Sequence, residues 1–384
     1  MKYNQPHVYP WDSHLGDRIT RLTSDDSTKK VIYIYTRPDN STFRYRVYNM
    51  CQALATGSSW KGIFFYDNEL EYVQKYLRHA SVVVLVRTFW SFSLEHFVSH
   101  AKKLGIPTLF DVDDLVFDVT KIPVVLNSLD QNASRHHIDW FGNVSRIWFA
   151  GTLCDATIGT NDFLCKRLQN CFQTPSFALN NFLNHEQLSI SQSLFNEKQM
   201  VTTEKKGFTI GYFSGTPSHI HDFRVVAFEL DELLKAYPEL TLEVAGYMQF
   251  PKFFKDHLKK KRVVHTPFVD FVTLQKNIAQ VDLNIVPLQD NEFTNCKSEL
   301  KFFEAAIVGT TTCATPTFTF QTSIDHGKTG YLCHEGEWFS SLENIYKNPV
   351  DFSMRTEAQK YCVERYSPEN QRHQIEKVLE SVLS

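Results

Sequence analysis

The residues with the most specific chemistry in this chain lie between positions 295 and 330. Lys297 and Lys301 follow an apolar, strand-like stretch, VDLNIVPL, and Glu304 comes three residues after Lys301. Side chains three, four or seven positions apart share a helix face, so we expect these three to project together. Ammonium groups near a helix N-terminus bind a diphosphate, and a carboxylate one turn further accepts hydrogen bonds from ribose hydroxyls. A solvated Lys/Glu face is the simpler interpretation of the same spacing.

Such residues need strands and helices to position them, and the chain provides two alternating series of both. The first series runs from VIYIYT (31–36) to a strand near 175–181, and the second begins with FTIGYFSG (208–215). This alternation produces right-handed βαβ crossovers and parallel sheets. Residues 184–207 lose the periodicity and are expected to form a linker. The predicted fold class is therefore α/β, with two Rossmann-like parallel domains.

The composition agrees with two domains of a water-soluble protein. The chain has 384 residues, 42% of them hydrophobic, which is enough for two cores. A formal net charge of −3 gives no general attraction to nucleic acid. Eight scattered cysteines without a CxxC pair favour reduced thiols over disulfides or a zinc site. Because no stretch matches a signal peptide or a membrane-spanning helix, we expect a cytoplasmic protein whose membrane contact is at most peripheral, at the inner face.

A longer pattern surrounds the two lysines. The string Lys-Ser-x-Leu-Lys-x-x-Glu-Ala-Ala, then Gly309, a Thr-rich strand and the turn 326–330 (HGKTG), resembles the nucleotide-sugar half of GT-B fold glycosyltransferases. It is similar in particular to the retaining group that includes glycosyltransferase family 4, the group 1 glycosyl transferases of bacterial surface-polysaccharide synthesis. Trp338 also stands where these proteins often have a tryptophan. The resemblance spans about residues 31 to 375 and implies two domains that face a central cleft.

The resemblance assigns roles to residues of the second half. It implies that Lys297 and Lys301 bind the diphosphate of a nucleotide sugar and act in catalysis, and that Glu304 binds its ribose. Gly215 and Thr216 would form the first phosphate-binding turn, in which small residues let main-chain N–H groups approach phosphate oxygens. Taken alone, a Ser-Gly-Thr sequence is more often an ordinary turn.

Two departures from the family pattern concern the same site. The family commonly has an arginine in the first turn and a lysine several residues later, near the places of Thr216 and His221. It also has a glutamate eight residues before the position of Glu304, where this chain has Cys296. Glu299 is then the nearest substitute for holding the hydroxyls of the donor sugar.

The first half carries candidate acceptor residues. RPDNSTFRYRV and TLFDVDDLVFD resemble two stretches of surface-polysaccharide glycosyltransferases, the second of which borders the acceptor cleft. The resemblance places Arg44, Arg46, Asp111 and Asp114 on the acceptor side, with Asp113 among the catalytic residues. Residues two positions apart diverge on a regular helix, so a helix directs at most one of the two arginines to a cleft. Solvated arginines are the alternative.

Other chemistries fit the acidic stretch. Asp111 and Asp113 mimic the metal-binding motif of GT-A glycosyltransferases, as well as the nucleophile and acid of haloacid-dehalogenase phosphatases. The phosphatase pattern has a threonine where this chain has Leu115, and the GT-A pattern does not account for a second α/β domain. An acidic helix cap is the alternative without a function. The basic stretch KFFKDHLKKKRVVH (252–265) would suit an anionic lipid or polymer, but a solvated helix and loop is the simpler interpretation.

The predicted domains are an acceptor-side domain over 1–200, whose residues 1–30 form a polar extension, and a donor domain over 201–362. A helix over 363–384 is expected to cross back to the first domain. Its apolar residues recur at helical spacing, which requires a surface to cover. Ser367-Pro368 provides its start signal.

The expected function is that of a hexosyl-type glycosyltransferase in surface polysaccharide or glycan synthesis. It would move a sugar from a nucleotide-diphosphate donor to a saccharide or lipid-linked acceptor, with retention of configuration and without a metal or other cofactor. No nucleic-acid partner is expected. Two alternatives remain open: a metal-dependent phosphatase that uses Asp111 and Asp113, and a catalytically inactive GT-B protein that binds a glycan or a partner protein.

Overall fold

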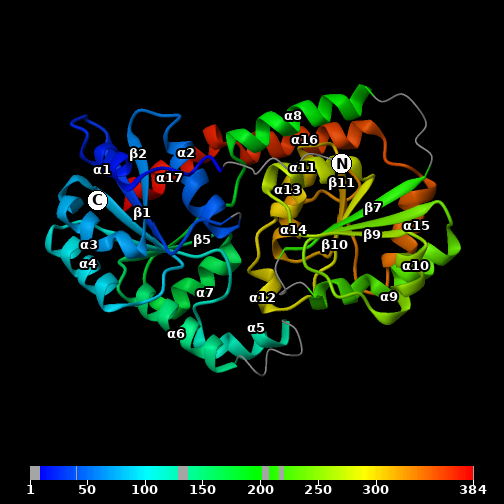
Figure 1. The fold of residues 1–384 in the computed structure, drawn as a ribbon, viewed down its shortest axis with the longest axis horizontal. Helices are drawn as coiled ribbons and strands as arrows, with labels where there is room; N and C mark the ends of the chain where they lie inside the picture. The colour runs from blue at the N-terminus through cyan, green and yellow to red at the C-terminus, as the bar shows by residue number, and fades with distance from the viewer. Residues whose placement is uncertain (1–8, 40, 129–136, 201–206, 216–219, 384) are drawn as a thin grey trace. The chain divides into compact units, whose positions relative to one another are not determined.

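The computed structural model describes residues 9–39, 41–128, 137–200, 207–215 and 220–383. The chain divides into two compact units, each assembled from segments that are separate in the sequence. The first unit comprises Met1–Val119, Phe141–Asn184 and Pro368–Ser384, and the second comprises Thr120–Trp140 and His185–Ser367. Each unit contains a six-stranded sheet with helices on both faces (Figure 1).

The sheet of the first unit is parallel throughout, with the strand order β2-β1-β3-β4-β5-β6. Its strands are β1 (Lys29–Tyr35), β2 (Trp60–Tyr66), β3 (Val82–Val86), β4 (Thr108–Asp111), β5 (Ala156–Gly159) and β6 (Ser176–Ala178). Every side chain of β3 is buried because helices cover both faces, which explains its uninterrupted apolar sequence, VVVLV. The loops that follow the carboxyl ends of these strands share one edge of the sheet.

Helices and short helical turns accompany the strands of the first unit. They are α1 (Leu15–Thr23), the π-helical turn η1 (Arg44–Tyr48), α2 (Asn49–Leu54), the 3₁₀ turn η2 (Asp67–Glu69), α3 (Leu70–Val73), the 3₁₀ turn η3 (Gln74–His79), α4 (Phe92–Lys103), α6 (His137–Thr152), α7 (Asp162–Phe172) and α17 (Pro368–Ser381). Ser91 and Asn161 fix where α4 and α7 begin, since each side chain accepts a hydrogen bond from the main-chain N–H three residues later, at 3.2 and 2.9 Å.

Helices α1 and α17 both pack on this unit. Arg18 of α1 pairs with Glu69 at 2.7 Å, so the expected polar extension contains a helix attached through an ion pair. Helix α17 lies beside α2 (Figure 1), and Arg372 Nη1 donates to the main-chain oxygen of Thr56 at 2.7 Å. The structure thus groups α17 with the first unit, although it follows the second unit in the sequence.

The sheet of the second unit is also parallel, with the order β12-β11-β10-β7-β8-β9. Its strands are β7 (Phe208–Phe213), β8 (Leu240–Ala245), β9 (Val263–Thr266), β10 (Leu283–Val286), β11 (Thr311–Ala314) and β12 (Tyr331–Leu332). The connecting segments are η4 (Val119–Lys121), α5 (Ile122–Ser128), α8 (His185–Met200), α9 (Ile220–Ala236), η7 (Lys252–Phe254), α10 (Lys255–Lys259), α11 (Phe271–Gln280), α12 (Glu292–Asn295), α13 (Leu300–Ala306), α14 (Phe318–Ser323), α15 (Trp338–Lys347) and α16 (Phe352–Tyr366). Trp338 is fully buried in the core of this unit.

The segment expected to be a linker is helix α8. Gln187, Ser191 and Phe195 recur every four residues and are buried, and Ser191 accepts a hydrogen bond of 2.8 Å from Gln275 of α11. The linker prediction was therefore wrong for residues 185–200. Two of the three buried positions are polar, so the sequence lacks the apolar stripe that identifies a helix.

Residues 120–140 also depart from the expected boundaries, because contacts group them with the second unit. Lys121 pairs with Glu292 of α12 at 2.8 Å, and Asn291 Nδ2 donates to Ser128 Oγ at 3.2 Å. No helix among the described residues is long and apolar enough to cross a membrane.

Candidate functional site

The cationic candidates of the second unit lie beyond the carboxyl end of β10. Lys301 is in the first turn of α13, and its Nζ lies 5.4 Å from the centre of the Tyr212 ring. Burial lowers the pKa of Lys301 to about 8; the Lys297 charge also lowers it, while Asp222 and Glu304 raise it. Within the described residues, Lys301 forms no ion pair. The ammonium is therefore held in a desolvated position where an anionic ligand would stabilise its charge.

Lys297 does not lie on the same helix as Lys301. It precedes α13, and its Nζ lies 4.4 Å from the centre of the Phe293 ring, while its main-chain oxygen accepts a hydrogen bond of 3.0 Å from Thr319. The expected single helix face is thus wrong, because the chain turns between α12 and α13. The two ammonium groups are still close enough for Lys297 to affect the pKa of Lys301.

Asp222 is a component that the sequence analysis missed. It is buried in the first turn of α9, and its Oδ1 accepts a hydrogen bond of 3.2 Å from the main-chain N–H of Gln289. It favours the charged form of Lys301 and, after burial, is the main cause that raises the pKa of Tyr212. An acidic residue at the start of the helix after the Gly215 turn was the available signal.

The two candidate glutamates are both buried. Glu304 accepts a hydrogen bond of 3.4 Å from Gln187 of α8. Glu299 accepts one of 2.7 Å from the Tyr366 hydroxyl, which joins it to α16. Glu299 therefore takes part in packing α16, which weakens its candidacy as a sugar-binding substitute for the missing glutamate.

The turn after β7 depends on a glycine in the neighbouring loop. Gly246 has a φ of +99°, and a Cβ there would lie 1.9 Å from the main-chain oxygen of Ser214. Only glycine allows this approach. Gly215 follows directly, and its main-chain oxygen lies 3.5 Å from the Tyr247 nitrogen that donates to it. Thr216 lies outside the described residues.

In the first unit, Arg46 and Asp111 form a fully buried pair. Arg46 Nε and Nη2 each donate to one oxygen of Asp111 at 2.8 Å, and Nη1 donates to the main-chain oxygen of Leu179 at 2.7 Å. Arg46 is 0% exposed and Asp111 is 1% exposed. This pair therefore joins η1 to the ends of β4 and β6 inside the unit. Arg44 is buried too, with its guanidinium 4.1 Å from the Tyr45 ring centre.

A second, more open cluster surrounds Asp113. Thr42 Oγ1 donates to Asp113 Oδ2 at 2.8 Å, Arg87 Nη1 lies 3.3 Å from Oδ1, and Asp114 is 3.8 Å from the same Arg87 nitrogen. Burial opposes the charge of Arg87, but the two aspartates raise its pKa on balance. We call Thr42, Arg87, Asp113 and Asp114 the Asp113 cluster.

Arg87 was not among the predicted residues. It is the first residue after β3 and has a φ of +44°, in the left-handed region that residues with a side chain seldom adopt. Its main-chain N–H donates to the main-chain oxygen of Asp111 at 2.8 Å, which holds Arg87 in this conformation. An arginine directly after a buried strand was the only sequence signal.

The geometry of Asp111 bears on the phosphatase alternative. A nucleophilic aspartate must reach its substrate, whereas both Asp111 oxygens accept hydrogen bonds from Arg46 inside the unit. The described residues contain no group of three or more His, Cys, Asp or Glu side chains suited to holding a metal ion.

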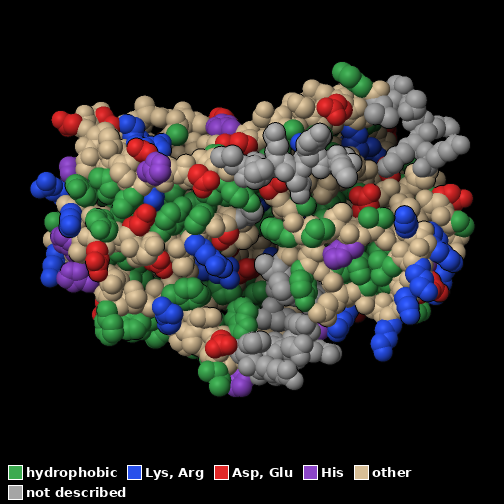
Figure 2. All heavy atoms as spheres, viewed as in Figure 1, with side chains coloured by type: hydrophobic (Ala, Val, Ile, Leu, Met, Phe, Trp, Pro, Cys, Tyr) green, Lys and Arg blue, Asp and Glu red, His purple; other side chains and the backbone are tan. Residues whose placement is uncertain are grey.

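The basic stretch 252–265 is a solvated surface. Figure 2 shows Lys and Arg side chains gathered over α10, and the lysines of this stretch are exposed. Arg262 instead donates to the main-chain oxygens of Tyr237 and Leu240, at 2.6 and 2.7 Å. Its guanidinium thus links β9 to the loop before β8.

Comparison with known proteins identifies the fold of this chain. No family model matches the chain, and no curated protein matches it. A solved structure of Anabaena Alr3699/HepE, in complex with UDP and glucose, matches 92% of this chain and 100% of its own, at 14% identity and a TM-score of 0.58. The chain has the GT-B fold. The predicted fold class is thereby confirmed, and at this identity the likeness concerns the fold alone.

Two further solved structures that match this chain differ from HepE in length or in activity. The pneumococcal O-GlcNAc transferase GtfA, in complex with UDP and GlcNAc, matches 82% of this chain but 60% of its own, at 14% identity and a TM-score of 0.54. The N-terminal domain of Candida albicans trehalose-6-phosphate phosphatase matches 92% of this chain and 97% of its own, at 8% identity and a TM-score of 0.60. Proteins whose names give different activities thus have similar folds, so function must be argued from the site.

Proposed function

We propose that this GT-B protein is a nucleotide-sugar glycosyltransferase whose second unit binds the diphosphate of the donor. The observation that carries the proposal is Lys301, a desolvated ammonium group that forms no ion pair with the described residues and lies at the carboxyl edge of a parallel sheet. This edge is where open α/β sheets bind ligands. HepE and GtfA, with the same fold, were solved with UDP and a sugar, which supports a nucleotide-sugar donor here as well.

The proposed chemistry uses this charge in the transition state. The bond between the anomeric carbon of the donor sugar and the diphosphate oxygen breaks, and Lys301 and Lys297 stabilise the negative charge that develops on the leaving group. An acceptor hydroxyl forms the new bond to that carbon and passes its proton to the departing diphosphate oxygen. Retention of configuration, independence of metal and a role in surface polysaccharide synthesis extend the proposal, and they rest on the family resemblance.

The other components have subsidiary roles in this proposal. Glu304 would accept hydrogen bonds from the ribose hydroxyls. In the first unit, Asp113 and Arg87 would contact the acceptor saccharide, because their side chains are partly open to solvent. The buried Arg46–Asp111 pair would stabilise the loops at the carboxyl edge of this sheet without contacting a ligand.

Thermal unfolding with UDP, GDP, dTDP, CMP and ADP tests the donor site directly. A ligand at a hundred times its Kd adds about 2.7 kcal/mol to the free energy of unfolding, which raises Tm measurably. We expect at least one nucleoside diphosphate to raise Tm and Lys301→Ala to remove this effect. If none of the five nucleotides shifts Tm, the proposed function is wrong. Sugar transfer or slow hydrolysis of the matching nucleotide sugar then separates an enzyme from an inactive GT-B protein.

A further inference from the structure

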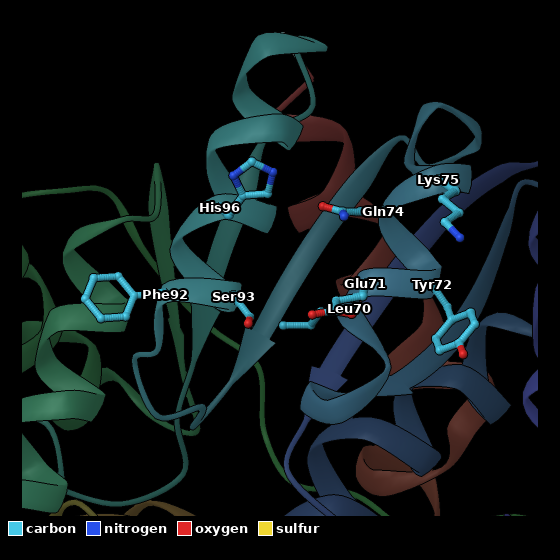
Figure 3. A pocket seen from close by; sticks show the side chains of 8 residues that line it. All are labelled: Leu70, Glu71, Tyr72, Gln74, Lys75, Phe92, Ser93 and His96. Atoms are coloured by element: carbon cyan, nitrogen blue, oxygen red, sulfur yellow. The ribbon is translucent and has the colours of Figure 1, made fainter.

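A groove on the first unit lies between two helical segments that follow β2 and β3. It has a volume of about 560 Å³ and runs between α3 and η3 on one side and the first turns of α4 on the other (Figure 3). Its lining side chains include Glu71, Tyr72, Gln74, Phe92, Ser93 and His96. None of them belongs to the Asp113 cluster.

Two aromatic rings of the groove are open to solvent. Phe92 is 81% exposed and Tyr72 is 60% exposed, which is unusual for side chains with this much apolar surface. Phe92 is positioned by an edge-to-face contact with Trp90, at 5.0 Å between ring centres. Trp90 is held in turn by a hydrogen bond of 2.9 Å from its Nε1 to Glu95. The contact with Trp90 therefore holds the Phe92 ring in its exposed position.

Four polar side chains of the groove are unengaged among the described residues, whereas Lys75 Nζ lies 5.5 Å from the centre of the Tyr72 ring. Within the part of the chain that the structure describes, the side chains of Glu71, Gln74, Ser93 and His96 make no intramolecular hydrogen bond or ion pair. Figure 3 shows Gln74 and His96 on opposite walls, from η3 and α4. Together they offer a carboxylate, an amide, a hydroxyl and an imidazole, which can both donate and accept hydrogen bonds.

The groove also begins at the edge of the sheet that carries the candidate acceptor residues. Leu70 follows the end of β2 by four residues, and Phe92 follows the end of β3 by six, with Arg87 of the Asp113 cluster between. Both segments leave the same sheet edge, since β2 and β3 are parallel. The groove and the Asp113 cluster therefore lie beyond the same edge of the sheet.

We propose that this groove binds a saccharide chain, namely the sugar units of an oligosaccharide acceptor beyond the one that reacts. A pyranose has an apolar C–H face and a rim of hydroxyls, which matches exposed rings combined with unengaged donors and acceptors. The mixed lining contains both a carboxylate and a lysine, Lys75, and so favours a polyhydroxylated ligand over an anionic surface. The role as an acceptor site rests on the proposed function.

A glycan array that spans neutral, amino and anionic mono- to hexasaccharides, with the full-length protein as the analyte, tests the groove. We expect binding to oligosaccharides and little to monosaccharides, and roughly a tenfold or greater loss in Phe92→Ala and Tyr72→Ala, the size expected for losing one buried ring. Phe92→Tyr should retain binding because it keeps the ring. Phe228→Ala is the matched control, since Phe228 is 67% exposed on α9 of the other unit.

Three results would overturn the proposal: no oligosaccharide binding by the wild type, equal binding by wild type and Phe92→Ala, or self-association in sedimentation that Phe92→Ala abolishes. The last would identify a second copy of the chain as the occupant. UDP-dependent thermal shift in Phe92→Ala separates the two proposals, because the donor site lies in the other unit. If glycans bind but no nucleotide raises Tm, the proposal for the groove would hold and the proposed function would be wrong.

Discussion

The charged groups at the carboxyl edges of the two sheets differ in whether an ion pair neutralises them. In the first unit, Arg46 meets Asp111 through two hydrogen bonds of 2.8 Å, and both are excluded from solvent. In the second, Lys301 faces an aromatic ring, and burial lowers its pKa to about 8. A buried cation with its own carboxylate has a structural role, whereas a half-buried one that forms no ion pair with the described residues is suited to an external anion. The same family resemblance had pointed to Arg46 and Lys301 alike as site residues.

The largest expected effect concerns the buried Arg46–Asp111 pair. Arg46→Leu should lower the free energy of unfolding of the first unit by about 3–5 kcal/mol, because it leaves the Asp111 carboxylate buried without its partner. Urea denaturation followed by circular dichroism would measure it. Arg87→Leu is the control, since it removes a partly exposed pair and should cost only about 0–1 kcal/mol. Equal losses of unfolding free energy in the two variants would contradict the distinction between a buried and a partly exposed ion pair.

For Lys301 the expected effect is on binding. Lys301→Ala should weaken nucleotide affinity by about 1.5–3 kcal/mol, the usual contribution of a charged hydrogen bond. Glu304→Gln should weaken it within the same range through the ribose. Isothermal calorimetry with the nucleotide that shifts Tm would show both. Unchanged affinity in both variants would mean that the diphosphate binds elsewhere.

The pKa of Lys301 gives a pH dependence with a definite sign. Nucleotide binding requires the charged form, so affinity should change little between about pH 7, where the terminal phosphate is largely ionised, and the free pKa of about 8, and should fall as the pH rises above it. The fall approaches about tenfold per pH unit until the pKa of the complex is reached. Calorimetry at pH 8 in buffers of different ionisation enthalpy should show uptake of about half a proton. Lys301→Arg should bind without this pH dependence, and a wild-type affinity that is flat from pH 7 to 9.5 would exclude Lys301.

The smallest expected effect is that of a chelator. If lysines neutralise the diphosphate, EDTA should leave sugar transfer unchanged. Loss of transfer in EDTA and recovery with Mg²⁺ or Mn²⁺ would instead make the Asp113 cluster a metal site. In that case Asp113→Asn should abolish the metal response, whereas Asp118→Asn, four residues after Asp114, should not.

The sequence predicted the repeating architecture because strands such as VVVLV are buried on both faces and are apolar throughout. It did not predict α8, whose buried positions include Gln187 and Ser191, or the grouping of residues 120–140 with the second unit. The latter rests on tertiary contacts such as the pair between Lys121 and Glu292, which no local pattern encodes.

At the site, residue types were easier to predict than their surroundings. Lys297 and Lys301 were found from their spacing, although they do not share a helix. Asp222 and Arg87 were missed because each is a single charged residue at the start of a connection, a common occurrence in α/β proteins. That Arg46 is neutralised by Asp111, whereas Lys301 has no ion pair in the described chain, depends on contacts across the sequence.

Helix α17 has a consequence for the order of events during synthesis. The first unit contains residues up to Asn184 and again from Pro368, so a ribosome must make the whole segment His185–Ser367 before α17 can reach α2. At 5–20 residues per second this takes on the order of 10 to 40 seconds. During this interval the surface of α2 that α17 covers is exposed, while the second unit has the time to fold. We therefore expect the nascent first unit to be the part of this protein that depends most on chaperones.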